Sequence, residues 1–248
     1  GTVFVAGVGM TPFGRHLDKS IKDLTRAAVE QALADAGAAR TDLQAAFFSN
    51  CTQGHFEGQH MVRGELALRA MGIGRIPVVN VENACASAST AFHLAVTYVQ
   101  SGAADIALAV GAEKMIASDK QLMFSAFDSA WDVHDVAQSK QNLLQMGRGI
   151  EPPPGTMSDK PYSVFMDIYA AMGRLHMREY GTTRRQFAAV AAKNHGHSVH
   201  NPLSQYQKAF SVDEVLASPP IAYPLTVLMC SPVTDGAAAA IVCNQAGL

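Results

Sequence analysis

The stretch that decides the fold is VVNVENACASASTAFHLAV, residues 78–96. Its first part is apolar and β-branched and predicts a buried strand, while residues 86–100 predict a strongly apolar helix. Cys85 would therefore lie on a strand-to-helix turn, at or just before a helix N-terminus. The unpaired N–H groups and the dipole at such an end stabilise a negative group.

A thiolate at this turn is stabilised and nucleophilic, which makes Cys85 a candidate catalytic residue. The alternative is a buried cysteine that packs as a small hydrophobic side chain, since free cysteines are among the most buried residues. Small neighbours, among them Ala84, Ala86 and Ser87, leave room for a substrate or for close packing of another element. Position and spacing alone leave both interpretations open.

Further apolar runs predict strands at residues 2–9, 43–50, 76–82 and 105–113. Helical spacing predicts helices at 21–36, 59–71 and 86–100, the first capped by Ser20 and ended by Gly37. Continuous apolar strands that alternate with helices indicate a mainly parallel sheet covered on both faces. Ligands of such sheets bind beyond the carboxyl ends of the strands.

The alternation stops near Met115 and returns at AAAAIVC, residues 237–243, which predicts a fifth strand after Asp235 and Gly236. Helices are expected at 164–179 and 183–197, with a short one after Ser211. An excursion this long normally has its own core. We therefore predict an α/β fold: a five-stranded, mixed but mostly parallel sheet with helices on both faces and an inserted α-rich loop domain. The expected boundaries are 1–114 and 225–248 for the sheet domain and 115–224 for the insertion.

Composition narrows the class of protein. The 248 residues are 48% hydrophobic and carry a net charge of −2, which argues against nucleic-acid or membrane-surface partners. No apolar run reaches the roughly 20 residues that span a bilayer, and no secretory signal is visible. The four cysteines show no metal-binding spacing, so we expect reduced thiols, no metal and a cytoplasmic protein.

Several motifs resemble one family. NACASAST (83–90) with ALAVGAEKM (107–115) resembles the nucleophile region of thiolases, and SPVTDGAAAAIV (231–242) resembles the close of their N-terminal domain. Residues 176–207 and FSVDEVLAS (210–218) are similar to the thiolase domain of sterol carrier protein X and related lipid-transfer thiolases. The resemblance covers essentially the whole chain.

The resemblance implies that Cys85 accepts an acyl group while a 3-oxoacyl-CoA is cleaved thiolytically, or formed by the reverse Claisen condensation. The acyl group could be branched or sterol-like, coenzyme A is the co-substrate, and no covalently bound cofactor is expected. A second reading is a retro-aldolase that cleaves steroid side-chain CoA esters. A third is a non-catalytic acyl-CoA-binding subunit that scaffolds a partner. A eukaryotic member would be peroxisomal.

Thiolases have two similar halves, and this chain resembles only the first. The C-terminal half, which carries the catalytic histidine and a second cysteine, has no counterpart here. The expected partners are a second copy of the chain, a chain supplying the C-terminal half, or a small accessory subunit. Ser231 and Cys230 are candidates for contact with coenzyme A. Phe165, Met166 and Met172 are candidates for the acyl pocket, although their helical spacing also suits a plain core.

Four histidines are potential metal ligands or general bases. His195, His197 and His200 do not share one helical face, so a structural or CoA-loop role is expected in place of a metal site. His93 lies too far along its helix from Cys85 to act as its base and is expected in the core.

Overall fold

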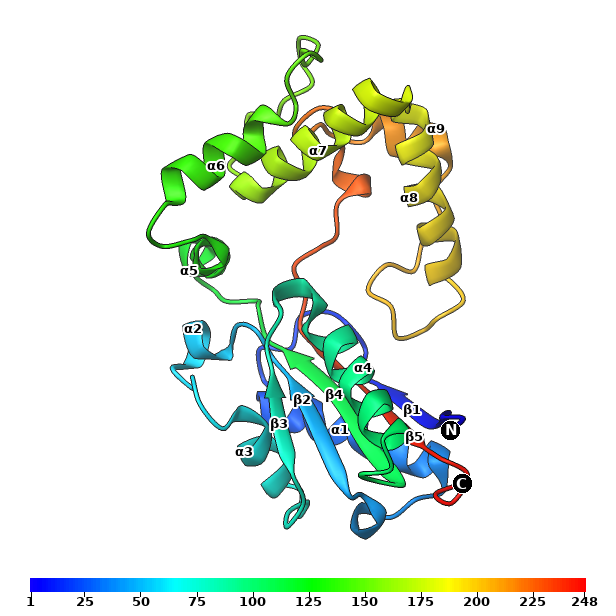
Figure 1. Ribbon diagram of the computed structural model, residues 1–248. Helices are drawn as coiled ribbons and strands as arrows, with labels where there is room; N and C mark the ends of the chain where they lie inside the picture. The colour runs from blue at the N-terminus through cyan, green and yellow to red at the C-terminus, as the bar shows by residue number, and fades with distance from the viewer. The chain divides into compact units, whose positions relative to one another are not determined.

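The computed structural model describes residues 1–248, except for the side chain of Lys120. The chain forms two compact units (Figure 1). Gly1–Leu122 and Val233–Leu248 make the first unit, and Met123–Pro232 makes the second. The first unit contains the sheet and the strand-to-helix turn that the sequence singles out.

The sheet has five strands in the order β1-β5-β4-β2-β3 (Figure 1). β2 is parallel to β3 and to β4, whereas β5 is antiparallel to β1 and β4. Four strands therefore run in one direction, which confirms the predicted mixed, mostly parallel sheet. The strands are β1 Phe4–Met10, β2 Ala45–Ser49, β3 Val78–Val81, β4 Ile106–Glu113 and β5 Gly236–Cys243.

Helices cover both faces of the sheet, as predicted. On one face, α1 (Ile21–Ala36) and α3 (Arg63–Arg69) pack on a core that includes Phe48; on the other, α4 (Ser87–Gln100) packs on a core that includes Phe47. Because neighbouring residues of a strand point to opposite faces, β2 supplies side chains to both cores.

α1 lies unusually close to β1. A Cβ atom added to Gly7 would lie 2.4 Å from the carbonyl oxygen of Ala32, and one added to Gly9 would lie 2.1 Å from that of Ala28. These distances are far inside van der Waals contact, so the two glycines allow strand and helix backbones to meet. The capping box of Ser20 fixes where the helix begins.

The predicted helix at 59–71 is wrong in its first part. The structure has two short helices, α2 (Gln53–Glu57) and α3, joined by a loop. Gly58 ends α2 in the left-handed conformation with φ 74°, and Val62 precedes α3 with φ 50°. Gly58 thus ends the preceding helix, and Val62 interrupts the predicted segment, whose apolar spacing suits one continuous helix.

The second unit is helical. α7 (Val164–Tyr180) packs with α6 (Val136–Gln145), and α8 (Arg184–Ser198) packs with α9 (Val212–Ala217). The helices expected at 164–179, 183–197 and after Ser211 are confirmed. α6 was not predicted, because none of its residues is buried and its sequence is largely polar.

α5 (Lys120–Ser125) joins the two units and was also not predicted. Short 3₁₀ segments complete the list: η1 Arg40–Asp42, η2 Ala84–Ala86, η3 Ala126–Ala130 and η4 Val227–Met229. Within the described part of the chain, none of the helices combines the length and the apolar character needed to cross a bilayer.

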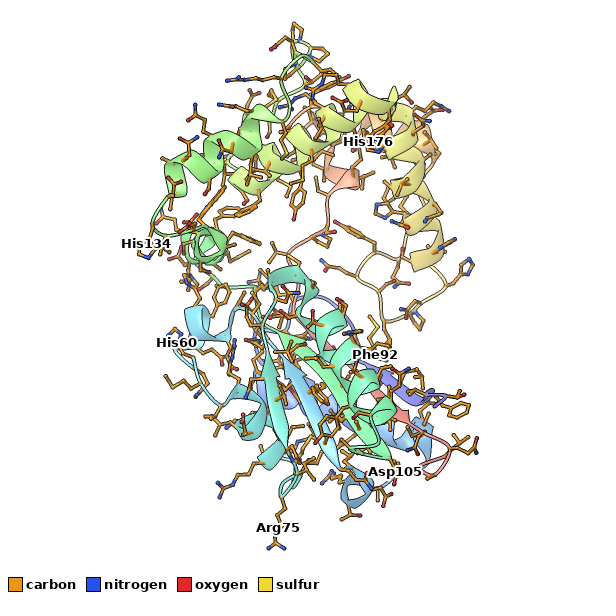
Figure 2. All side chains as sticks on the ribbon, in the orientation of Figure 1. His60, Arg75, Phe92, Asp105, His134 and His176 are labelled. Carbon is orange, nitrogen blue, oxygen red and sulfur yellow. The ribbon has the colours of Figure 1, made fainter. Side chains whose placement is uncertain are left out.

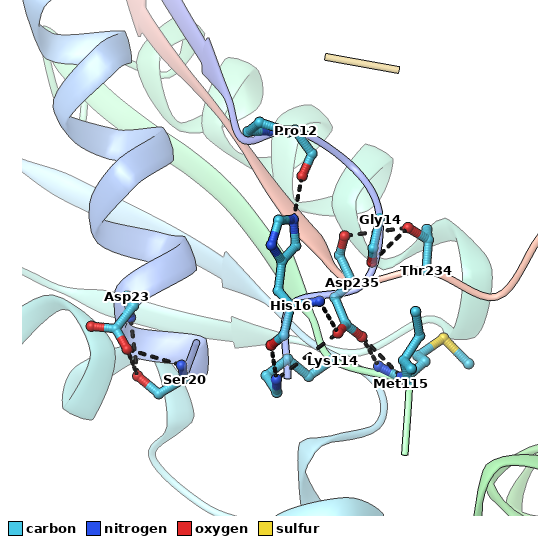
Figure 3. Close-up of polar contacts among 10 residues, drawn as sticks. Pro12, Gly14, His16, Ser20, Asp23, Lys114, Met115, Thr234 and Asp235 are labelled. Atoms are coloured by element: carbon cyan, nitrogen blue, oxygen red, sulfur yellow. Dashed lines mark hydrogen bonds and ion pairs between the residues drawn. The ribbon is translucent and has the colours of Figure 1, made fainter. Parts of the chain in front are cut away.

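Asp235 joins three segments of the first unit (Figure 3). Its buried carboxylate accepts hydrogen bonds from the backbone N–H groups of Met115 (2.8 Å), Ile116 (2.9 Å) and His16 (3.1 Å). The Lys114 ammonium lies 3.9 Å from the same carboxylate. The segment after β1, the chain leaving β4 and the chain entering β5 thus meet at one charged side chain.

We predict that Asp235→Asn lowers the free energy of unfolding by about 2–3 kcal/mol, because an amide N–H₂ would face backbone donors in a buried site. Urea titration followed by circular dichroism measures the change. Asp18→Asn is the matched control, since Asp18 is exposed and pairs with the neighbouring Lys19, so that its substitution should leave the transition where it is. Equal midpoints for the two variants would contradict the role given to Asp235.

Candidate active site

Cys85 lies on the turn between β3 and α4, as the sequence predicts. The strand ends at Val81, the 3₁₀ turn η2 contains Cys85, and α4 begins at Ser87. The Cys85 side chain is exposed. The alternative interpretation, a buried cysteine that fills the core, is therefore wrong for this residue.

Hydrogen bonds fix the backbone on either side of Cys85. The Ser87 hydroxyl accepts from Asn83 N–H (2.8 Å) and donates to the Ala84 carbonyl (2.7 Å). One carboxylate oxygen of Glu82, Oε1, accepts from Ala84 N–H (2.6 Å). The N–H of Cys85 itself has no acceptor among the described residues, so it remains available to a ligand.

Ala84, immediately before Cys85, has a strained backbone. Its φ is 46°, in the left-handed region that L-residues other than glycine, asparagine and aspartate rarely adopt. This conformation costs on the order of 1–2 kcal/mol for a residue with a Cβ. Strain of this kind gathers at functional sites, where the surrounding structure holds it in place.

The first turn of α4 lies directly on β4 at Gly111. A Cβ atom at this position would come within 2.6 Å of Ser49 Oγ and 3.0 Å of Ala88 Cβ. Glycine thus allows the helix start, and with it Cys85, to sit close against the carboxyl ends of the strands.

A carboxylate network lies beside this turn, at the end of β4. Glu113 accepts from the backbone N–H groups of Cys51 and Thr52 and from the side chains of Thr52 and Asn50. Arg63 donates to Asn50 Oδ1 (2.9 Å), and Asn50 is 1% exposed. Burial raises the pKa of Glu113, while the hydrogen bonds from Thr52 and Cys51 oppose the rise.

Cys51 is a second exposed thiol at this end of the sheet. Its S–H donates to Glu82 Oε1 over 3.6 Å, the same oxygen that holds Ala84 N–H. Desolvation, followed by the charges of Glu113 and Glu82, raises the pKa of Cys51 to about 12, so its thiol is protonated at neutral pH. Cys51 was not predicted from the sequence to lie at the site. The only signal for it was that it follows a buried strand, as Cys85 does.

The candidates for coenzyme A contact belong to the second unit. Cys230 is half-buried, its thiol donates to the Thr226 carbonyl (3.4 Å), and burial raises its pKa. Ser231 is exposed. Neither position tests the predicted role, which stays a prediction.

The candidates for the acyl pocket lie in α7, also in the second unit. Phe165 stacks on Trp131 with ring centroids 5.0 Å apart, and Met166 is half-buried. Met172 is 40% exposed. Phe165 therefore belongs to a small aromatic cluster, and Met172 offers an apolar surface.

His195 has the structural role that was expected. It is 8% exposed, its Nε2 lies 3.0 Å from the Leu228 carbonyl oxygen, and its ring meets those of Tyr206 and Phe210 edge-on. No group of three or more histidine, cysteine or acidic side chains in the described residues could hold a metal ion.

The expectation for His93 is wrong, because this side chain is exposed. The buried residues of α4 recur at Ser87, Ala91, Ala95 and Val99, which face the sheet. His93 follows Phe92, which is 36% exposed and also lies off that face (Figure 2). The apolar sequence of α4 therefore predicted more burial of this helix than the first unit provides.

Comparison with known proteins agrees with this fold. Residues 3–246 match the family model described as thiolase, N-terminal domain. The chain belongs to the thiolase family, and the match covers its N-terminal domain. The resemblance noted in the sequence is confirmed.

Two curated relatives make the match more specific. The chain is 38% identical to sterol carrier protein 2 of Homo sapiens, over 98% of this chain and 42% of that protein. It is 35% identical to acetyl-CoA acetyltransferase of Methanothermobacter thermautotrophicus, over 97% of this chain and 56% of that protein. The chain thus spans about half the length of the curated relatives it matches.

A solved structure, titled Ltp2-ChsH2(DUF35) aldolase, has the same fold. It superposes with a TM-score of 0.71 at 23% identity, over 99% of this chain and 56% of that chain. At 23% identity this similarity supports the fold alone, that is, the order of the strands in the sheet and the inserted helical unit.

We predict opposite effects for two substitutions of Ala84. Ala84→Gly relieves the left-handed strain and should keep or raise the free energy of unfolding, by up to about 1 kcal/mol after the entropy of the unfolded chain is counted. Ala84→Val places a β-branched side chain in the same conformation and should lower it by about 2 kcal/mol or more. Chemical denaturation gives both values.

Ala34→Val, on the exposed side of α1, is the control for the added methyl groups. It should lower the free energy of unfolding by only about 0.5 kcal/mol. If Ala84→Val lowers the free energy of unfolding no more than Ala34→Val does, the turn is not strained.

Proposed function

We propose that this chain supplies the nucleophile of a thiolytic enzyme, in which Cys85 accepts the acyl group of a 3-oxoacyl-CoA. The observation that carries the proposal is the exposed Cys85 thiol on a strained turn before a helix of 14 residues. Its own N–H has no acceptor among the described residues. A thiolate at a helix N-terminus is stabilised by the dipole and by unpaired N–H groups.

The proposed reaction begins when the Cys85 thiolate attacks the 3-oxo carbon. The negative charge that develops on the carbonyl oxygen needs fixed donors. We propose the N–H of Cys85, which has no acceptor among the described residues, as one of them. The bond between C2 and C3 then breaks, and its electron pair leaves with acetyl-CoA as an enolate. Coenzyme A takes the shortened acyl group from Cys85. The reverse sequence is a Claisen condensation.

The remaining acid–base groups are expected from the C-terminal half of a complete thiolase. Cys85 is therefore the residue on which the proposal depends. Contact of Ser231 and Cys230 with coenzyme A, and of Phe165, Met166 and Met172 with a branched or sterol-like acyl group, are additional proposals that depend on the same reaction.

A retro-aldolase is the second candidate, supported by the fold shared with the Ltp2-ChsH2(DUF35) aldolase. It would cleave a CoA ester of a steroid side chain without an acyl-cysteine. A non-catalytic acyl-CoA-binding subunit is the third. The exposed Cys85 on its rigid turn argues against this third reading, because a scaffold needs no accessible thiol.

Acyl transfer predicts a covalent adduct. The complete protein that contains this chain is mixed with a 3-oxoacyl-CoA, quenched in acid and mapped by mass spectrometry, and the acyl group should lie on Cys85. Cys85→Ala should abolish both adduct and thiolysis, whereas Cys51→Ser, which removes the other exposed thiol, should leave the adduct on Cys85. Carbon–carbon cleavage that continues in Cys85→Ala would support the retro-aldolase. Tight binding without cleavage in the unaltered protein would support the scaffold.

We also propose that the chain self-associates through the outer edge of β3. In the described sheet β3 pairs only with β2, which leaves one side of the strand without a partner. Val79 on β3 is 41% exposed, Leu66 on the neighbouring α3 is 37% exposed, and Val62 before α3 is 50% exposed. Unpaired apolar edges favour pairing with another chain.

Light scattering tests this surface. Val79→Lys should lower the mass of the assembly, because a charge on the edge opposes strand pairing. Val8→Lys, on the other edge strand β1 where Val8 is 57% exposed, should leave the mass unchanged. A complex that persists in Val79→Lys would place the contact elsewhere. A mass that rises only when an accessory chain is added would favour a hetero-oligomer.

A further inference from the structure

The two exposed thiols lie at the same end of neighbouring strands. β2 and β3 are parallel, with Ser49 opposite Val81 in the register. Cys51 follows Ser49 by two positions, and Cys85 follows Val81 by four. Because parallel strands end at the same edge of a sheet, both cysteines lie at that edge.

Glu82 links the two cysteine segments through a single atom. Its Oε1 accepts from the Cys51 thiol (3.6 Å) and from the N–H of Ala84 (2.6 Å), the residue joined to Cys85. Cys85 also contributes to the electrostatic field at the Cys51 thiol. Neither cysteine is part of a long helix or a strand.

We propose that Cys51 and Cys85 form a reversible disulfide when the protein meets a hydroperoxide. The cross-link itself depends only on the two thiols. Its consequence, that the nucleophile is withdrawn and then restored by a thiol reductant, rests on the proposed function of Cys85.

The reaction balances in two steps. The Cys85 thiolate attacks one peroxide oxygen and the O–O bond breaks, which gives a Cys85 sulfenic acid and a hydroxide, or an alkoxide from an alkyl hydroperoxide. This leaving group takes up a proton from solvent and departs as water or an alcohol. Cys51 loses its proton and attacks the sulfenic sulfur, so that the S–S bond forms and the S–O bond breaks. The departing hydroxide takes up a proton and leaves as water. The two thiols are oxidised by two electrons, and the peroxide is reduced.

The surrounding carboxylates control the second step. Glu82 and Glu113 favour the protonated form of Cys51, and a protonated thiol is a poor nucleophile. Glu82→Gln removes one of these charges and keeps an oxygen that can accept from Ala84 N–H. This variant should therefore close the disulfide several-fold faster than the unaltered protein.

Peptide mapping tests the proposal without any need for turnover. The complete protein is treated with hydrogen peroxide, its free thiols are blocked, and it is digested without reductant. A peptide pair joined through Cys51 and Cys85 should appear and should vanish after treatment with dithiothreitol.

The variants give the decisive comparisons. Cys51→Ser should yield no cross-link and should let Cys85 proceed to the sulfinic acid, because no second thiol traps the sulfenic acid. Cys230→Ser, which removes a half-buried thiol of the second unit, should give the same cross-link yield as the unaltered protein. Glu82→Gln tests the step in which Cys51 attacks the sulfenic sulfur, and this variant retains both cysteines.

Two results would overturn the inference. One is oxidation of Cys85 to the sulfinic acid at equal rates with and without Cys51. The other is a cross-link that joins Cys85 to a cysteine other than Cys51. A Cys51–Cys85 disulfide in a protein that shows no thiolysis would support the cross-link and refute only the proposed function.

Discussion

The parallel pairing of β2 with its two neighbours is the constraint on which the site depends. It brings the carboxyl ends of β3, β2 and β4 to one edge, so that Cys85, Cys51 and Glu113 become neighbours although they are distant in the chain. Each strand contributes a different group: an exposed thiol on a turn, a second thiol, and a partly desolvated carboxylate. The pairing of β2 with β4 lets Glu113 reach the backbone N–H groups of Cys51 and Thr52.

The turn before α4 shows how local strain and packing support each other. Ala84 is held in an unfavourable conformation by hydrogen bonds from and to its own backbone, which involve Glu82 and Ser87. Gly111 removes the side chain that would otherwise push the helix away from the sheet. Contacts from several residues offset the cost of this strain. The result is an accessible thiol whose N–H has no acceptor among the described residues.

Much of the fold and part of the site could be predicted from the sequence. Continuous apolar runs gave the five strands, and the change from strand to helix placed Cys85 on its turn. The helix predicted at 59–71 is shorter in the structure because Val62 adopts a left-handed conformation that apolar spacing does not reveal. Cys51 was missed because its importance comes from strand order, and a sequence does not state which strands become neighbours. His93 was misplaced because an apolar helix can have one face that its own domain leaves exposed.

Asp235 has a consequence for how this architecture can vary. The chain leaves the sheet domain just after Met115 and Ile116 and returns just before Asp235, and all three are joined by hydrogen bonds. The ends of the insertion are therefore fixed within the first unit, whatever lies between them. Loop-closure entropy changes slowly with length, so segments of different size can be accommodated at these ends. Residues 123–232 can thus be regarded as an exchangeable module, and chimeras that keep Asp235 and its donors would exchange this unit between relatives without rebuilding the sheet.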